Sequence, residues 1–287
     1  MVSQLPLPRL EARALDPLHI VTDDALARET GVRVVFTGRK GGLSTGDYRG
    51  LNLAGHVGDD PSSVEENRAL LMRVLGAPDV PVVVPNQVHG DNLVVIENSS
   101  TRGRAAELAR VRAICAEGAD GIVCHAPDVA PLLCFADCVP VIVVSPSGSF
   151  AVVHAGWRGV VASIASKAVL RLVEYDRSVA GATSRLVEDI AGSYNVYIGP
   201  HIHGECFECG EDLIRRFVDQ FGEACSRDPR HVDLAEALRI DLVRVGVDGS
   251  RIADAGACTM CHPDQYYSYR AEGGTCGRHG ALAFRRS

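Results

Sequence analysis

Lysine, basic clusters and long apolar runs are scarce in this chain of 287 residues, and each scarcity excludes a class of protein. Only Lys40 and Lys167 are lysines among the 29 basic residues, which we attribute mainly to genomic composition bias. The formal net charge is −7 and no basic run interleaves with aromatic residues, so a nucleic-acid partner is not expected. No apolar run approaches the roughly 18 residues of a membrane-spanning helix, so a membrane partner is not expected either.

Signals for secretion are also missing from the sequence. The first residues, MVSQLPLPRLEARAL, lack the apolar core of a signal peptide. Ten cysteines are scattered along the chain and form no short disulfide framework, a pattern typical of reduced thiols in a cytoplasm. The apolar content of 46% and the charged content of 23% are those of a globular enzyme. We therefore expect a cytoplasmic enzyme, and its oligomeric state stays open.

Two pairs of cysteines with CxxC spacing, Cys206/Cys209 and Cys258/Cys261, suggest a structural zinc bound by four thiolates. The pairs are much farther apart than the ~12–20 residues that separate the two pairs of a zinc ribbon or finger. The first pair also precedes a helical pattern, as a thioredoxin-like motif does, but the surrounding βαβ repeat is missing. Free thiols are therefore the default interpretation of these four residues.

The most informative stretch of the chain is residues 132–160. It contains two short β-branched runs, Val139–Val144 and Phe150–Val153, joined by Ser-Pro-Ser-Gly-Ser. This pattern predicts two buried strands and a tight turn. Because an antiparallel strand begins where its neighbour ends, Cys138 and His154 are expected at one edge of the sheet. A thiol beside an imidazole is either part of a metal site or a nucleophile with its base.

Two chemistries stay open for this pair of side chains. A thiol hydrolase or amidase would use Cys138 as nucleophile, His154 as base and Asp120 to orient the base. A catalytic metal site would use His89, Cys138 and His154 and leave a fourth position for water or substrate. The residues alone do not rank one chemistry above the other. A multicopper oxidase would need many histidine pairs, and the chain has a single His-x-His pair.

The remaining patterns define the expected fold. Gly38–Gly46 holds four glycines with Arg39 and Lys40, and is either a backbone cradle for phosphate or an ordinary surface loop. Apolar residues at helical spacing predict one amphipathic helix over residues 159–175. No linker divides the chain, so we expect an α+β fold in which residues 31–287 form one domain of mixed β-sheets layered with flanking helices. Residues 1–30 would be an N-terminal extension.

Five short motifs occur together and in order along the chain. They are Asn86-Gln-Val-His-Gly90, Ala119-Asp-Gly121, Ala136-Asp-Cys-Val-Pro140, Val153-His-Ala-Gly-Trp-Arg-Gly159 and Tyr267-Ser-Tyr-Arg270. With Thr37–Gly46, Leu51-Asn-Leu53 and Gly199-Pro200, they make nearly the whole chain resemble the YfiH-like laccase-domain family, also called polyphenol oxidase or multicopper oxidase-like. The chain departs from the family pattern at Phe207-Glu208-Cys209, where Tyr-Glu-Val is usual, and at Ala271, where a second arginine is usual.

The resemblance implies a zinc-dependent purine nucleoside phosphorylase that acts on adenosine, inosine, guanosine and methylthioadenosine, with adenosine deamination as a further activity. His89, Cys138 and His154 match the family's zinc ligands, and copper could replace zinc in vitro. Some members of the family have been linked to peptidoglycan maintenance. The alternatives are therefore a maintenance factor or a Cys-dependent hydrolase that uses Cys138 and His154.

Phosphorolysis requires a bound, oriented phosphate and stabilisation of the departing purine. The candidates for binding phosphate are Arg39, Lys40, Arg270 and Arg278. Of these, Arg39 is also proposed as a catalytic residue, together with the Cys138, His154 and Asp120 group.

Deamination would require a group that transfers a proton to the leaving amine. Zinc deaminases use a glutamate two residues after a ligand histidine, and neither His89 nor His154 has one at that position. Asp120 or Asp137 would have to serve instead, which makes deamination the weaker of the two predicted activities.

Overall fold

The structure is a computed structural model that describes residues 4–98, 103–180, 186–226 and 228–287. The strands are β1 (Glu11–Leu15), β2 (Leu18–Thr22), β3 (Val32–Thr37), β4 (Val82–Val83), β5 (Leu93–Ile96), β6 (Gly121–Cys124), β7 (Ala130–Phe135), β8 (Val139–Val144), β9 (Phe150–Ala155), β10 (Asn195–Ile198), β11 (Ile252–Asp254) and β12 (His279–Arg285). The helices are α1 (Asp24–Thr30), α2 (Pro61–Val74), α3 (Arg104–Glu117), α4 (Trp157–Val161), α5 (Ile164–Ala180), α6 (Val187–Ala191), α7 (Glu211–Phe221) and α8 (Leu234–Arg244). None of the helices in the described ranges combines the length and apolarity needed to cross a bilayer.

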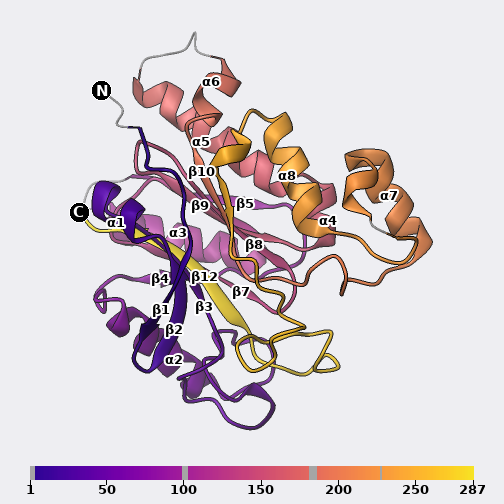
Figure 1. Ribbon diagram of the computed structural model, residues 1–287. Helices are drawn as coiled ribbons and strands as arrows, with labels where there is room; N and C mark the ends of the chain where they lie inside the picture. Colours follow the sequence, from indigo (N-terminus) through magenta and orange to yellow (C-terminus); the bar gives the residue numbers. More distant parts are fainter. Residues whose placement is uncertain (1–3, 99–102, 181–185, 227) are drawn as a thin grey trace.

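The strands form two six-stranded sheets. The first has the order β1-β2-β3-β12-β7-β4, and the second has the order β11-β10-β8-β9-β6-β5. Both sheets are mixed, because β4 pairs with β7, β5 with β6 and β10 with β11 in parallel, whereas the other pairs are antiparallel. The last strand of the chain, β12, lies in the middle of the first sheet, between β3 and β7 (Figure 1). The two ends of the chain therefore share one sheet.

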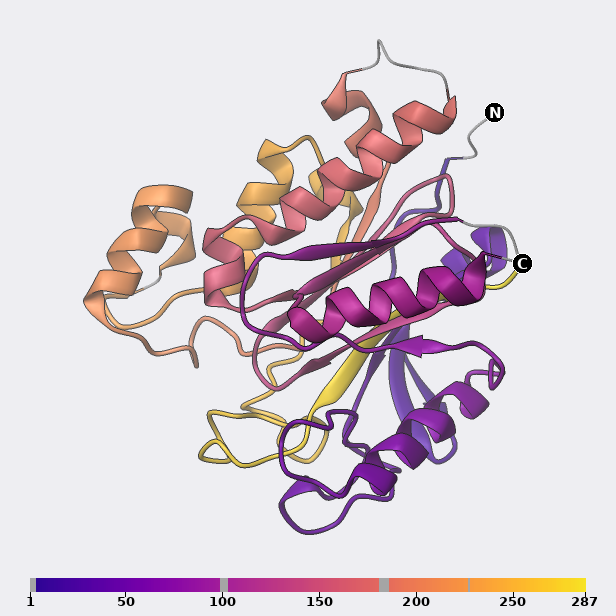
Figure 2. The same ribbon diagram turned by 180° about the vertical axis from the view of Figure 1, so that it is seen from behind.

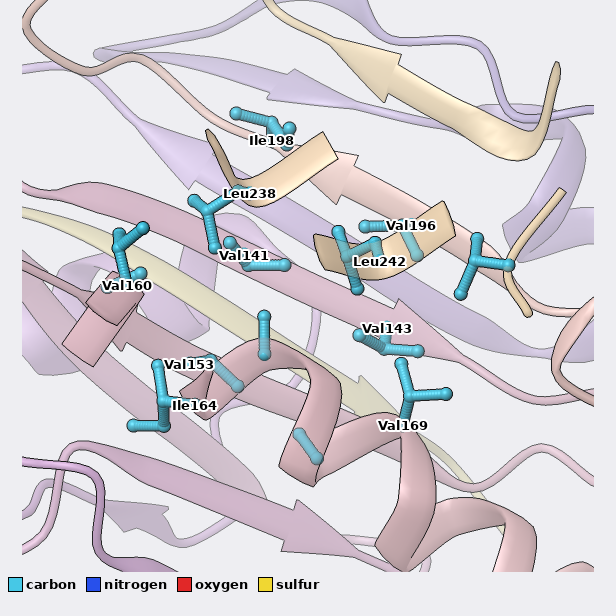
Figure 3. Packing of buried hydrophobic residues seen from close by; sticks show 14 of the residues in the cluster. Val141, Val143, Val153, Val160, Ile164, Val169, Val196, Ile198, Leu238 and Leu242 are labelled. Atoms are coloured by element: carbon cyan, nitrogen blue, oxygen red, sulfur yellow. The ribbon is translucent and has the colours of Figure 1, made fainter. Parts of the chain in front are cut away.

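Alternation along each strand distributes the apolar side chains between two faces. In β8, Ile142 and Val144 belong to the core between the two sheets, whereas Val141 and Val143 point to the other face and pack with α5 and α8 (Figure 3). Helix α2 covers the outer face of the first sheet, and α3 packs against the core between the sheets (Figure 2). The result is a helix–sheet–sheet–helix arrangement, which confirms the predicted α+β fold of mixed sheets with flanking helices.

The N-terminal segment is part of this arrangement. Strands β1 and β2 extend the first sheet beyond β3, although the sequence analysis assigned residues 1–30 to an extension. Asp23, which is 1% exposed, caps α1 by accepting from the N–H of Leu26, and also accepts from the hydroxyl of Tyr197 at 2.9 Å. Because Tyr197 belongs to β10, this carboxylate ties the N-terminal segment to the second sheet.

The predicted hairpin is confirmed, while the predicted helix after it is interrupted. Strands β8 and β9 pair antiparallel over their whole length. The single helix expected over residues 159–175 is two helices, α4 and α5, separated at Ser163, which has a φ of 57°. The Ser163 hydroxyl donates to Asp241 of α8 at 3.1 Å, so a tertiary contact holds the break. The apolar periodicity continues across the break, so the pattern predicted one uninterrupted helix.

Candidate metal centre

Two strand ends of the second sheet and one loop meet at one edge and carry the proposed ligands. Cys138 directly precedes β8, and His154 lies one residue before the end of β9, where it pairs with Pro140. His89 lies in the loop between β4 and β5. One donor atom from each of these three side chains lies within 4.8 Å of the others. The predicted meeting of Cys138 and His154 at one sheet edge is confirmed, and His89 joins them.

Asp120 holds two of the three ligands in place. Its carboxylate, which is fully buried, accepts from His154 Nδ1 at 2.8 Å. It also accepts from the backbone N–H groups of His89 at 2.9 Å and Gly90 at 2.6 Å. With Nδ1 of His154 bound to a carboxylate, Nε2 is the ring nitrogen left for a metal. The sequence analysis proposed Asp120 as the group that orients His154, and the hydrogen bond between them fits that role.

Charges in the site favour an ionised thiol. Burial alone would raise the pKa of the Cys138 thiol, but the neighbouring His154 and His89 rings outweigh burial and lower that pKa to about 6. Burial would also lower the pKa of His154, whereas Cys138 and Asp120 raise it to about 9. Metals bind the thiolate form of cysteine and the neutral form of histidine. The site therefore provides the thiolate at neutral pH, and a bound cation would displace the imidazole proton.

The backbone at the site is held in uncommon conformations. His89 has a φ of 58° and Asp137, the residue before Cys138, has a φ of 90°. Residues other than glycine rarely adopt positive φ, and such strain tends to concentrate at functional sites. Gly156 lies against the ligands, since a Cβ atom there would be 3.1 Å from His89 Cδ2 and 3.2 Å from Cys138 Sγ. Ligand position thus depends on backbone geometry that the surrounding structure enforces.

A pocket of about 420 Å³ opens at the three ligands. Besides the ligands its wall offers aromatic faces, guanidinium groups and uncharged polar groups. The lining residues are His56, Gln87, His89, Cys134, Ala136, Asp137, Cys138, His154, Trp157, Arg158, Ile202, Phe207, Tyr269, Arg270 and Arg278. A pocket of this kind can bind a molecule that has both a flat ring and an anionic group.

Asp137 connects the pocket to two loops that are distant in sequence. One carboxylate oxygen accepts from the Thr259 hydroxyl at 2.7 Å, and the other accepts from the backbone N–H of Arg270 at 2.7 Å. The carbonyl of Asp137 accepts from the N–H of Ile202 at 2.9 Å. The residue beside Cys138 therefore fixes both the loop after β10 and the loop before β12, which carry much of the pocket wall.

The structure brings only two of the four proposed phosphate-binding residues to the pocket. Arg270 and Arg278 line it, whereas Arg39 and Lys40 do not. Arg39 pairs with Glu272 at 3.2 Å and lies 4.3 Å from the centre of the Tyr267 ring. Through these contacts the Arg39 guanidinium holds the loop before β12 against the first sheet.

Two glycines of the segment Gly38–Gly46 are explained by close packing of backbone. A Cβ atom on Gly41 would lie 2.1 Å from the carbonyl oxygen of Pro17, and one on Gly42 would lie 2.2 Å from that of Gly50. Both positions therefore require glycine for steric reasons alone. The neighbouring Lys40 forms an ion pair with Asp264, with 3.5 Å between Nζ and the carboxylate oxygen.

The sequence analysis missed several residues of the pocket wall. Trp157 and Arg158 stood inside a recognised motif without a role, and the structure stacks the Arg158 guanidinium 4.3 Å from the Trp157 ring. Gln87 also stood in a motif, and its side chain exchanges two 2.8 Å hydrogen bonds with the Cys134 backbone. His56 had no signal in the sequence, because the loop that carries it reaches the pocket through tertiary contacts alone.

Comparison with known proteins extends over almost the whole chain. Residues 33–286 match the family model described as multi-copper polyphenol oxidoreductase laccase. A purine nucleoside phosphorylase from Bacteroides thetaiotaomicron is 30% identical over 263 residues, which cover 89% of this chain and 92% of that protein. The purine nucleoside phosphorylase YlmD from Geobacillus stearothermophilus is 33% identical over 260 residues, 88% of this chain and 89% of that protein.

A relative of another name and two crystal structures complete the comparison. Adenosine deaminase RL5, from an unknown prokaryotic organism, is 33% identical over 239 residues, which cover 80% of this chain and 85% of that protein. The crystal structure of YlmD from Geobacillus stearothermophilus superposes with a TM-score of 0.77 at 28% identity, covering 98% of this chain and 99% of that chain. The crystal structure of YfiH from Bacillus licheniformis gives the same TM-score at 25% identity, covering 96% and 99%.

Proposed function

The chain belongs to the multi-copper polyphenol oxidoreductase laccase family, and from that membership we propose that it is a zinc-dependent purine nucleoside phosphorylase. The observation that carries the proposal is one pocket that contains a His–Cys–His ligand group, three arginines and three aromatic side chains. The relatives named purine nucleoside phosphorylase support the same activity. Adenosine, inosine, guanosine and methylthioadenosine are the proposed nucleosides.

The ligand group fits a metal, and zinc is the one we propose. Two imidazoles and a thiolate are ligands that zinc accepts, and three protein ligands leave a position open, as in catalytic zinc sites. The hydrogen bond from His154 Nδ1 to Asp120 is the outer support that such histidines usually have. A zinc ion held by His89, Cys138 and His154 would supply a Lewis acid at the base of the pocket.

The pocket wall can hold both reactants. Trp157, Phe207 and Tyr269 offer faces on which a purine can stack. Arg270 and Arg278 offer charged donors for phosphate oxygens. In phosphorolysis a phosphate oxygen bonds to the anomeric carbon while the bond from that carbon to the purine nitrogen breaks. The bonding electrons leave with the purine, which takes up a proton. Arginines that hold the phosphate in a fixed orientation lower the entropic part of the activation barrier.

The Cys-dependent hydrolase is the second candidate, because Cys138, His154 and Asp120 also form a thiolate–imidazole–carboxylate series. What favours the metal is His89, which has no part in a thiol mechanism and yet contributes a donor atom to the same group. Adenosine deamination would use the same metal with Asp120 or Asp137 as the proton carrier. Both carboxylates already accept hydrogen bonds, Asp120 from His154 and the backbone and Asp137 from Thr259 and the backbone of Arg270, so neither is a free proton carrier.

The deciding experiment measures metal and two activities on one preparation made without added copper. We expect about one zinc in the centre per chain and phosphate-dependent release of hypoxanthine from inosine, with negligible oxidation of phenols. Copper-loaded protein can oxidise some phenol, because copper binds such ligands more tightly than zinc. Strong oxygen-dependent phenol turnover with several coppers per chain and no nucleoside cleavage would refute the proposal.

The anion site gives a separate prediction. Arg270→Ala is expected to raise the KM for phosphate by about 10- to 100-fold, because a hydrogen bond to a charged group contributes ~1.5–3 kcal/mol, while the zinc content stays unchanged. Arg270→Lys should rescue only part of the loss, since lysine lacks the two-pronged guanidinium. The measurement is initial rate against phosphate concentration at saturating inosine.

Arg39→Ala is the matched control for Arg270→Ala. Arg39 pairs with Glu272 outside the pocket, so its loss should change the thermal stability more than the KM for phosphate. The reverse pattern, with a large KM effect at Arg39 and none at Arg270, would return the phosphate site to the glycine-rich loop.

A further inference from the structure

A second group of metal-ligand residues lies outside the pocket. Cys206, Cys258 and Cys261 bring their sulfur atoms within 4.8 Å of one another, and Cys206 Sγ is 3.5 Å from Cys261 Sγ. The fourth cysteine of the two CxxC pairs, Cys209, is not in the group. It turns instead toward the helix-covered core, and its N–H donates to the carbonyl of Arg230 at 2.9 Å.

Spacing of the sulfur atoms suits one tetrahedral ion. A zinc–sulfur bond of ~2.3 Å places the sulfurs of a tetrahedral site about 3.8 Å apart. The 3.5 Å separation of Cys206 and Cys261 is close to that value, and the 4.8 Å limit for the group requires only small rotations of side chains. The distance is much longer than the ~2.05 Å of a disulfide bond.

The backbone around the three thiols has two features of structural zinc sites with thiolate ligands, a C-x2-C turn and an N–H donor to sulfur. Cys258-Thr-Met-Cys261 has the C-x2-C spacing of structural zinc ligands, and its turn is closed by a hydrogen bond from the His262 N–H to the Cys258 carbonyl at 3.2 Å. Cys258 Sγ is 3.4 Å from the backbone nitrogen of His203, which donates to it. An N–H donor of this kind stabilises a thiolate and supports it from outside.

We propose that Cys206, Cys258 and Cys261 bind a second zinc ion, which clamps together the two loops that wall the pocket. Water completes the tetrahedron. The inference is independent of the proposed activity, because it concerns a different set of ligands. Cys206 lies on the loop after β10, and Cys258 and Cys261 lie on the loop before β12, so the ion joins segments more than 50 residues apart in sequence.

The consequence of such a clamp follows from the neighbours of its ligands. Phe207, next to Cys206, lines the pocket, and Thr259, next to Cys258, donates to Asp137. The two loops also meet through the backbone bridge between His201 and Cys258, and through the Arg270 side chain, which donates to the Glu208 carbonyl at 3.0 Å. Loss of the ion should therefore loosen the pocket wall without removing the ligands His89, Cys138 and His154.

The test counts metal in full-length variants prepared under reducing conditions. The wild type should carry about two zinc ions per chain, and Cys206→Ser or Cys261→Ser about one. Cys209→Ser is the matched control, a cysteine of the same CxxC pair, and should keep both ions. Cys138→Ala should keep the ion of the three-cysteine group, so this count does not depend on any phosphorylase activity.

Further measurements distinguish loss of the metal site from misfolding of a variant and from oxidation of the thiols. Cobalt added to the Cys138→Ala variant should give thiolate charge-transfer bands. In the double variant Cys138→Ala/Cys261→Ser these bands should be absent, and hydrogen exchange of residues 255–278 should be faster than in Cys138→Ala. A Cys138→Ala protein that binds no metal would overturn the proposal. So would a Cys206–Cys261 disulfide, seen as a chain two hydrogens lighter with both thiols unreactive and no second metal.

Discussion

Replacing Cys138 by alanine is expected to remove the metal of the pocket and the nucleoside-cleaving activity together. The thiolate is the one anionic ligand of the three, and its loss leaves two neutral imidazoles and weakens the charge balance of the site. Cys138 lies at the start of β8, and alanine fills the same backbone position without strain, so the fold should persist. We expect a loss of activity of more than about 1,000-fold, as for removal of other essential catalytic groups.

His89→Ala separates the two chemistries that Cys138→Ala alone cannot distinguish. A thiol hydrolase needs Cys138, His154 and Asp120, and would keep a substantial part of its activity without His89, whose ring only helps to lower the pKa of the Cys138 thiol. A metal enzyme would lose metal and activity in both variants. Metal analysis and inosine cleavage on both proteins provide the comparison, and full zinc occupancy in Cys138→Ala would sink the assignment of this ligand.

The edge of the second sheet was predictable because local patterns determine it. The β-branched runs of β8 and β9 and the short Gly/Pro/Ser turn between them allow only an antiparallel hairpin. Residues before the first strand and near the end of the second must then be neighbours, which placed Cys138 beside His154. No local pattern placed His89, and only the family motif assigned it to the site. Its loop, between β4 and β5, is held at this edge by the hydrogen bond from the His89 N–H to the Asp120 carboxylate.

Contacts distant in sequence were not predictable from the chain. The two CxxC pairs suggested one zinc bound by all four thiolates, with free thiols as the default interpretation. In the structure the bridge between His201 and Cys258 aligns the loops so that Cys206 meets Cys261 and Cys209 is excluded. Arg39 stood beside four glycines, which resembled an anion cradle. In the structure Gly41 and Gly42 are explained by close approach of backbone segments, and Glu272, far along the chain, pairs with the Arg39 guanidinium.

A parallel limit applies to the N-terminal strands. β1 and β2 are five residues each, and β1 alternates exposed positions with half-buried ones, so the sequence shows little apolar signal over β1. Their place in the sheet depends on pairing with β3 and on buried tertiary bonds such as that between Asp23 and Tyr197. Such bonds join residues that no local pattern relates.

Asp120 gives the second large prediction, because one carboxylate supports the whole site. Each carboxylate oxygen accepts more than one hydrogen bond: Oδ1 from His89 N–H and His154 Nδ1, and Oδ2 from Gly90 N–H and Val88 N–H. An asparagine has only one acceptor oxygen, so Asp120→Asn leaves one pair of donors facing an NH₂ group. Leaving buried donors without acceptors costs about 1–3 kcal/mol of stability.

The same substitution should disturb the metal. If the amide N–H faces His154 Nδ1, that nitrogen must become the acceptor, and the proton moves to Nε2, where it blocks the metal. Loss of an outer-shell partner typically weakens metal affinity by about 10- to 100-fold. We expect Asp120→Asn to show this loss in competition with a chelator, and a comparable loss of inosine cleavage at limiting zinc.

Acid should reveal the same carboxylate in the metal-free protein. Burial alone would raise the pKa of Asp120, but the hydrogen bonds from His154 and from the backbone N–H groups of Gly90 and His89 outweigh burial and lower it. A carboxylate whose folded-state pKa is lowered stabilises the fold above its ordinary pKa, and that contribution is lost as the pH falls through the lowered value. Wild type should therefore lose more stability than Asp120→Asn as the pH falls from the ordinary carboxylate pKa of about 4 through the lowered value.

Asp91→Asn is the control for both measurements. Asp91 lies in the same loop as His89, pairs with Lys167 at the surface, and has a side chain that is 48% exposed. Its loss should change neither metal affinity nor acid stability measurably, because an exposed ion pair contributes little. Wild-type zinc affinity in Asp120→Asn, or an equal loss in Asp91→Asn, would show that the carboxylate does not position His154. We expect the two asparagine variants to differ, because only Asp120 holds a metal ligand by its ring nitrogen.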